Sequence, residues 1–238
     1  MVMVSLTNRE AMKAHPSHKA TESKATRERW IELCKIVGAK DNPEIGRTSD
    51  KTYDELVRCY TDPQRHYHNL NHIGEGLAEI DEIRHLAKDP DSLEMAWWFH
   101  DIVYNVRNPS SENEMQSALY GRRILLELGL TTEFWLKIMR LILATTHDHI
   151  PKHDDGWLIV DIDLASLASP LTIFNRHTAE IREEYREVVP DDKDFDIGRV
   201  NFFRKFLENR PSIYLTEYFR DKYEAKAREN IGNYLAKF

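Results

Sequence analysis

The segment Ala96-Trp97-Trp98-Phe99-His100-Asp101-Ile102-Val103-Tyr104 places a histidine and an aspartate in the middle of an apolar run. Burying an ionised carboxylate alone is too costly, so Asp101 must be paired, hydrogen-bonded or bound to a metal. An amphipathic helix would carry these charges on its wet face, but here aromatic residues flank the pair on both sides. The segment therefore predicts a core helix that carries either a satisfied polar pair or a functional site.

The sequence on both sides of this run also shows helical periodicity. Apolar residues recur at helical spacing in the ranges 21–37, 49–60, 68–86, 91–104, 115–128, 131–142, 170–188, 194–209 and 212–238. The apolar segment 158–167 fits either a helix or a strand, and no segment shows sustained alternation. Ser111 and Glu114 fit a capping box before residue 115, which gives Glu114 a structural explanation.

These patterns predict an all-α protein. We expect residues 1–20 to form a loose N-terminal arm and residues 21–238 to form a single helical domain. Within that domain, the range 50–170 carries the groups that can bind a metal, and 170–238 is a C-terminal helical extension.

Composition excludes several classes of protein. The 238 residues include 33 Lys and Arg and 40 Asp and Glu, a net charge of −7, which argues against an extended nucleic-acid surface. Cys34 and Cys59 are too few for a disulfide scaffold or a four-thiolate zinc site. There is no run of 18 apolar residues and no secretory signal pattern, so we expect a soluble cytoplasmic protein without a membrane span. The eleven histidines remain unexplained.

Three further segments carry side chains that bind metals or move protons. His68 and His72 are four residues apart, so a helix would place them on one face. Asp161 and Asp163 lie among apolar neighbours and need partners. The range 145–149 contains two more histidines. Each has an ordinary structural alternative, such as a polar helix start, a cap or a solvated helix end, but together they form an imidazole–carboxylate set that suits a divalent transition metal.

Four motifs follow one another in the range 50–170. They are Arg65-His66-Tyr67-His68-Asn69 with His72-Ile73, then Phe99-His100-Asp101-Ile102-Val103-Tyr104, then Asn113-Glu114 with Ser117-Ala118, and finally Asp161-Ile162-Asp163-Leu164. This order resembles the HD-domain superfamily of metal-dependent phosphohydrolases, and within it a bacterial group of predicted HD phosphohydrolases. The segment 67–72 is also similar to the Y-H-N-x-x-H segment of cyclic-nucleotide phosphodiesterases, which are distant members of that superfamily. Those enzymes follow their HD pair with a His-Pro-Gly turn, whereas residues 102–104 are expected here to continue the helix, so a cyclic nucleotide is not the implied substrate.

The resemblance implies an HD-type helical bundle that binds a divalent metal ion, one of Mn, Mg, Co, Ni, Zn or Fe. Carried over by position, the metal ligands are His72, His100, Asp101 and Asp163, with Asp161 as the reserve for the last of them. The implied reaction is hydrolysis of a phosphate mono- or diester by a metal-activated water. The implied partner is a small phosphorylated substrate, with a nucleotide as one candidate, and a homo-oligomer is a further expectation.

The remaining roles follow from the same comparison and from position. His68 would protonate the leaving oxygen, and Asp101 would accept the proton of the attacking water or bridge to a second metal. Arg65 is the nearest guanidinium and would hold a phosphate oxygen, its alternative being a surface salt bridge. His147 is the candidate ligand for a second metal, and His149 is a weaker one.

Two other functions fit the same residues. An HD-type di-iron oxygenase would use His147, and with it His149, to hold a second iron. A non-catalytic, metal-stabilised module that senses a nucleotide would need neither His68 nor Arg65 beside the metal. No glycine-rich phosphate loop or base-binding motif is present in the sequence, so the substrate is not predicted.

Overall fold

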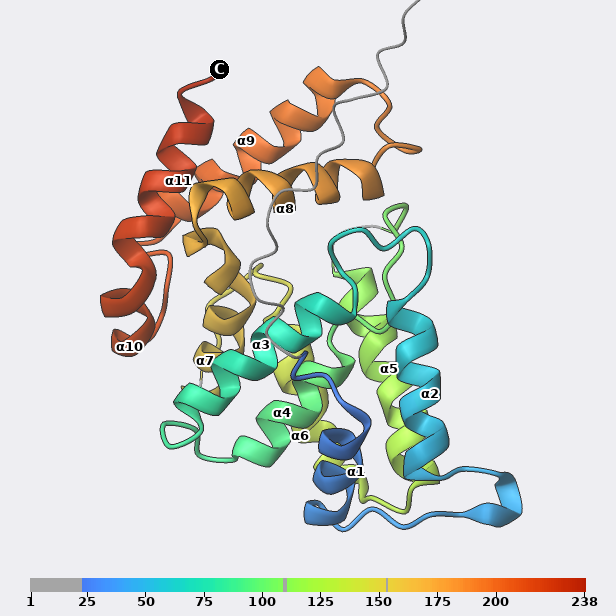
Figure 1. The fold of residues 1–238 in the computed structure, drawn as a ribbon. Helices are drawn as coiled ribbons and strands as arrows, with labels where there is room; N and C mark the ends of the chain where they lie inside the picture. Colours follow the sequence, from blue (N-terminus) through green and yellow to red (C-terminus); the bar gives the residue numbers. More distant parts are fainter. Residues whose placement is uncertain (1–22, 109–110, 153) are drawn as a thin grey trace, which may run out of the picture.

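The computed structural model describes residues 23–108, 111–152 and 154–238, and the predicted N-terminal arm (1–20) lies outside them. The described chain is all-helical, as predicted; it contains one isolated bridge between Asn42 and Arg47 and no β-strand. The helices are α1 (Arg27–Ile36), α2 (Ser49–Tyr60), α3 (Leu70–Ile83), α4 (Pro90–Phe99), α5 (Glu112–Glu127), α6 (Thr132–Ala144), α7 (Asp154–Leu164), α8 (Leu171–Glu184), α9 (Asp192–Asn209), α10 (Glu217–Phe219) and α11 (Ala225–Leu235) (Figure 1). Single 3-10 turns at Pro43–Ile45 and Ala165–Ala168 and a π-helical turn at Arg220–Glu224 complete them.

Helix α4 is the centre of the core. Every residue from Ser92 to Phe99 is buried, and α4 packs against α1, α3, α5, α6 and α7. Trp97 lies against α3 at Gly76, where an added Cβ would stand 2.0 Å from the indole ring. The Trp97 indole donates a hydrogen bond to the Ile73 carbonyl at 2.9 Å. This close approach of α3 and α4 sets the positions of the histidines that both helices carry.

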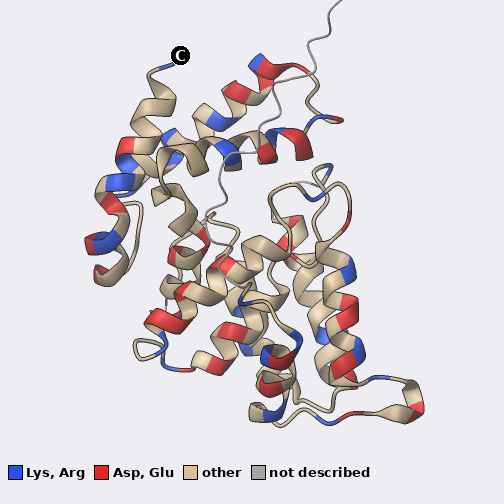
Figure 2. Ribbon diagram, viewed as in Figure 1, with Lys and Arg blue, Asp and Glu red and all other residues tan. Residues whose placement is uncertain are grey.

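The C-terminal helices form a second group next to α7. Figure 1 shows α8 and α9 side by side across one end of the molecule, with α11 running along the same side. Aromatic side chains fill the space between them, and Phe174, Phe203 and Tyr234 are all buried. Acidic and basic residues are spread over most of the helices (Figure 2), whereas the charged residues of α3 are all acidic.

Several sequence expectations were wrong in detail. Helix α4 ends at Phe99 and does not continue to Tyr104, so His100 and Asp101 stand at the helix end. Helix α3 begins at Leu70 after the cap Asn69, so His68 precedes it and does not share a helix face with His72. The ambiguous segment 158–167 is helical.

The capping box expected at Ser111 is also absent. Ser111 has a φ of 69° and its side chain makes no capping hydrogen bond, because its hydroxyl contacts Asp148 instead.

No single helix in the described ranges is long and apolar enough to cross a membrane. Two segments, 155–168 and 171–184, are long and apolar enough only when they are taken together, and the chain bends by 109° between them.

Candidate metal centre

Three helices bring His72, His100 and Asp163 to one point. His72 lies in the first turn of α3, His100 caps the end of α4, and Asp163 is in the last turn of α7. One side-chain N or O atom from each residue lies within 4.8 Å of the others. Asp101 follows His100 directly and joins them, its Oδ2 lying 3.1 Å from His100 Nε2 and 3.6 Å from His72 Nε2.

The distances between these atoms suit a shared cation. The two Nε2 atoms of His72 and His100 are 3.2 Å apart, and Asp163 Oδ1 lies 3.5 and 3.8 Å from them respectively. Donor atoms about 2.0–2.2 Å from one metal ion stand about 3–3.5 Å from one another at tetrahedral or octahedral angles. The group therefore has the dimensions of a divalent metal site.

Hydrogen bonding at His100 shows which kind of atom faces the site. His100 Nδ1 lies 2.8 Å from the Trp97 carbonyl, which only accepts, so Nδ1 carries a proton and Nε2 is the nitrogen that would present a lone pair to a metal once the ring is neutral. Two carboxylates face that lone pair. Burial acts to lower the pKa of His100, but Asp101 and Asp163 outweigh it and raise the pKa to about 9. The cluster thus favours a positive charge at its centre, which a metal ion would supply.

Asp161 has a different role from Asp163. It is fully buried, and its carboxylate accepts hydrogen bonds from the backbone N–H of Leu215 at 2.7 Å and of Thr216 at 2.8 Å. The Thr216 hydroxyl donates a third at 2.7 Å. Asp161 therefore fixes the chain before α10, while Asp163 faces the histidines.

His147 contacts the opposite oxygen of Asp163. Its Nε2 lies 2.8 Å from Asp163 Oδ2, so the Asp163 carboxylate stands between His147 and the His72–His100 pair. The backbone of His147 adopts a φ of 57°. Residues other than glycine rarely take this left-handed conformation, and it often occurs at functional positions. His149, in contrast, is exposed.

His68 forms a pair that the sequence did not indicate. Its Nδ1 lies 2.7 Å from Oε2 of Glu184, the last residue of α8, and Glu184 Oε1 accepts the backbone N–H groups of Tyr67 and His68, each at 2.8 Å. Burial acts to lower the pKa of His68, but Glu184, together with Asp101 and Asp163, outweighs it and the net shift is upward. The Tyr104 ring stacks on His68 with centroids 4.0 Å apart. His68 is thus held with its Nδ1 on Glu184 and its Nε2 available.

Arg65, which we expected to hold a phosphate oxygen, is bound to the backbone in this structure. The guanidinium donates hydrogen bonds to the backbone carbonyls of Asp101 at 2.5 Å, Ile102 at 2.7 Å and His68 at 3.1 Å. It also packs over the Tyr60 ring. Arg65 is therefore a positioning residue that fixes the chain after α4, with three of its five N–H donors bound to the backbone.

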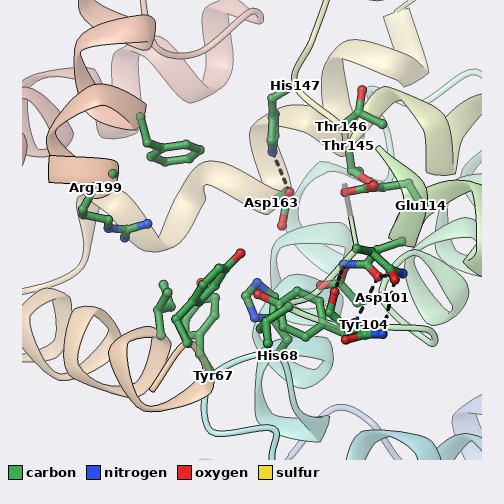
Figure 3. Close-up of a pocket in the computed structure, with 18 of the residues that line it drawn as sticks. Tyr67, His68, Asp101, Tyr104, Glu114, Thr145, Thr146, His147, Asp163 and Arg199 are labelled. Carbon is green, nitrogen blue, oxygen red and sulfur yellow. Dashed lines mark hydrogen bonds and ion pairs between the residues drawn. The ribbon is translucent and has the colours of Figure 1, made fainter. Parts of the chain in front are cut away.

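A cavity of about 570 Å³ opens beside the cluster (Figure 3). Its walls include His68, Asp101, His147 and Asp163, together with aromatic side chains from three parts of the chain. These aromatic residues are Tyr67, Tyr104, Tyr185, Phe195 and Phe202.

Glu114 also lines this cavity, in place of its expected capping role. Its Oε2 is buried and has no hydrogen-bond partner in the described chain, and burial raises its pKa. The sequence signal that explained Glu114 was a capping box that does not form. Glu114 is therefore a further carboxyl group on the cavity wall, besides Asp101, that could exchange a proton there.

Comparison with protein-family models finds no match to this chain, and comparison with curated proteins finds none either.

Proposed function

We propose that this protein is a metal-dependent phosphohydrolase that cleaves a phosphate mono- or diester, with a nucleotide as one candidate substrate. The observation that carries the proposal is the meeting of His72, His100 and Asp163, with Asp101, beside a cavity. The walls of that cavity include Asp101, Asp163 and His68, whose imidazole is held by Glu184. A structural metal would need only the His72, His100, Asp101 and Asp163 cluster, and not the His68–Glu184 pair. An imidazole held by a carboxylate beside an open cavity is a typical proton donor or acceptor.

A divalent ion held by His72, His100, Asp101 and Asp163 would act as a Lewis acid, lowering the pKa of a water and neutralising charge on a phosphoryl oxygen. The chain's own residues supply the proton transfers. His68 donates a proton from Nε2 to the leaving oxygen, while Glu184 keeps the imidazole oriented and favours its protonated form. Asp101 and Glu114 are two of the carboxylates on the cavity wall, and either one could accept a proton from the attacking water.

The test combines metal analysis with hydrolysis assays. The substrates are p-nitrophenyl phosphate and bis(p-nitrophenyl) phosphate, each assayed with Mn²⁺, Co²⁺, Ni²⁺ or Mg²⁺. Asp101→Ala should lower the rate at least about 100-fold, because it removes both a ligand and a proton acceptor. His100→Ala should lower the bound metal measured by elemental analysis.

The control is Asp221→Ala, which removes an exposed carboxylate on the π-helical turn. It should leave both the rate and the metal content unchanged. Equal hydrolysis by the wild type and Asp101→Ala would refute the catalytic assignment.

One observation favours a second candidate, an HD-type di-iron oxygenase. Asp163 presents its two oxygens to different histidines, His72 on one side and His147 on the other, as a bridging carboxylate would between two ions. Iron bound at two ions per chain together with O₂ consumption would establish this function. One non-iron metal per chain with phosphatase activity would exclude it.

A further inference from the structure

Arg199 stands on the cavity wall across from the metal cluster. It lies on α9, and Figure 3 shows its guanidinium pointing across the pocket toward Tyr67 and Asp163. Its guanidinium carbon lies 4.5 Å from the centre of the Phe203 ring and 5.3 Å from that of Phe202. The guanidinium therefore packs on these rings and also lines the cavity.

Arg199 has no carboxylate partner in the described part of the chain. Its Nε is buried without a hydrogen bond. Neighbouring arginines differ, since Arg182 and Arg186 both pair with Asp192, and Arg176 pairs with Glu180. Burial also lowers the pKa of Arg199. Burying the Nε–H of a guanidinium without a partner costs stability, and no carboxylate of the described residues offsets the charge, so this group on a cavity wall calls for an anionic ligand.

The position of Arg199 separates it from the group that is cleaved. A phosphoryl group that reacts must lie near Asp163 and His68, whereas Arg199 projects from the opposite wall (Figure 3). The rings of Tyr67 and Tyr185 line the space that a substrate would occupy between them. Aromatic walls of this kind suit an apolar or planar body that connects two charged ends.

We propose that Arg199 binds a second oxyanion of the substrate, distinct from the phosphoryl group that is hydrolysed. This inference rests on the proposed function and narrows its substrate class to phosphate esters that carry a further phosphate or carboxylate. The guanidinium fork recognises both groups through paired N–H···O hydrogen bonds.

Three phosphate esters that share the same benzene ring test the substrate class. Phenyl phosphate has no second anion, 4-carboxyphenyl phosphate adds a carboxylate, and benzene-1,4-diyl bisphosphate adds a phosphate. Arg199→Met should lower kcat/KM for at least one of the two-anion esters about 10- to 100-fold, the range that hydrogen bonds to charged groups provide. Arg199→Met should change kcat/KM for phenyl phosphate less than about twofold. The two-anion ester whose kcat/KM falls more identifies the kind of anion that Arg199 binds.

Arg204→Met is the matched control, because Arg204 lies five residues further along α9 and is exposed outside this cavity. It should leave all three values unchanged. An equal loss on all three esters with Arg199→Met would overturn the inference, as would no loss on any of them.

A binding measurement separates this inference from the proposed function. Inorganic phosphate is titrated into EDTA-treated protein and its heat of binding is recorded. The wild type and Arg204→Met should bind phosphate with equal affinity, and Arg199→Met at least about tenfold more weakly. Phosphate binding that depends on Arg199 in a protein that hydrolyses no ester would refute the proposed function and leave the anion site standing. Hydrolysis without any effect of Arg199 would refute the anion site alone.

Thermal unfolding distinguishes a ligand-binding arginine from a structural one. Methionine matches the length of the arginine stem and packs on aromatic rings, so Arg199→Met should have a Tm equal to or above that of the wild type. Arg199→Lys keeps the charge but loses the fork, and should show a smaller loss on the two-anion esters than Arg199→Met. A lower Tm in both variants, with phosphate affinity unchanged, would assign Arg199 to the fold and overturn the inference.

Discussion

At the residue scale, the structure assigns several side chains to partners that are far away in sequence. Glu184 is 116 positions from His68 and belongs to a different helix, yet it holds both the imidazole and the backbone before α3. This contact makes His68 a stronger candidate for general acid than its position in a motif alone.

Glu184→Gln should therefore change the pH dependence of hydrolysis. The negative charge of Glu184 stabilises protonated His68 and raises its pKa, and a general acid works only while protonated. The rate should fall as pH rises through this pKa, and in Glu184→Gln the fall should begin at lower pH. Profiles of kcat/KM against pH measure the shift.

Glu183→Gln is the control, because Glu183 immediately precedes Glu184, is exposed and pairs with Arg186. Its profile should match the wild type. Coincident profiles for wild type and Glu184→Gln would remove His68 from the role of general acid.

How much of the site the sequence could predict also depends on the residue. The ligand candidates were visible because an aspartate in an apolar run needs a partner, and His72, His100 and Asp163 do lie together. The backbone contacts of Arg65 were not predicted, because nothing in the local sequence shows that three carbonyls accept hydrogen bonds from its guanidinium. Arg199 was missed altogether, since an unpaired arginine is recognised only once the cavity around it is known.

At the scale of elements, the packing of α3 on α4 connects fold to site. Trp97 fills the notch at Gly76 and stacks on His100 with ring centroids 4.1 Å apart. An alanine at position 76 would place its Cβ 2.0 Å from this ring, so the indole or the helix must move. The orientation of His100 depends on the same ring.

Gly76→Ala should accordingly affect both stability and metal binding. Overpacking of a close helix contact costs about 1–3 kcal/mol or more, and a displaced Trp97 would also tilt His100 away from the cluster. We expect a lower free energy of unfolding in urea and weaker metal affinity by titration.

Gly232→Ala provides the comparison, because nothing lies within 4 Å of an added Cβ at this position of α11. It should stabilise the protein by about 0.5–1 kcal/mol through helix propensity and leave metal binding unchanged. Wild-type metal affinity in Gly76→Ala would show that the α3–α4 contact does not position His100.

Helical periodicity predicted the elements but not all their ends. The apolar pattern continues through Ile102 and Val103, but the chain leaves the helix at Phe99 and Arg65 binds the carbonyls that follow. A tertiary contact of this kind has no signature in local sequence. Segment 158–167 was ambiguous for a similar reason, since α7 is buried on almost all sides and lacks a polar face that would reveal its period.

At the scale of the whole molecule, the cluster links three helices that pack on one another in the core. His72, His100 and Asp163 come from α3, α4 and α7, and Asp163 also contacts His147 in the loop after α6. A ligand that binds the folded state and not the unfolded state adds to the free energy of unfolding. A metal at this point should therefore stabilise the fold as a whole.

Metal removal should lower the Tm by a measurable amount. At a metal concentration 100 times the Kd, the added stability is about 2.7 kcal/mol. For a chain of this size about 1 kcal/mol corresponds to 2–4 °C, so chelation by EDTA should lower the Tm by about 5–10 °C. Restoring Mn²⁺ or Co²⁺ should reverse the change, as followed by circular dichroism.

Two neighbouring aspartates make this test specific. Asp163→Asn replaces a carboxylate oxygen of the proposed metal site with an amide nitrogen, so the Tm of this variant should no longer respond to EDTA. Asp161→Asn weakens the hydrogen bonds to Leu215 and Thr216 and should lower the Tm, but it should keep the full response to EDTA. A full EDTA response in Asp163→Asn, or its loss in Asp161→Asn, would show that the metal does not bind at the point where α3, α4 and α7 meet.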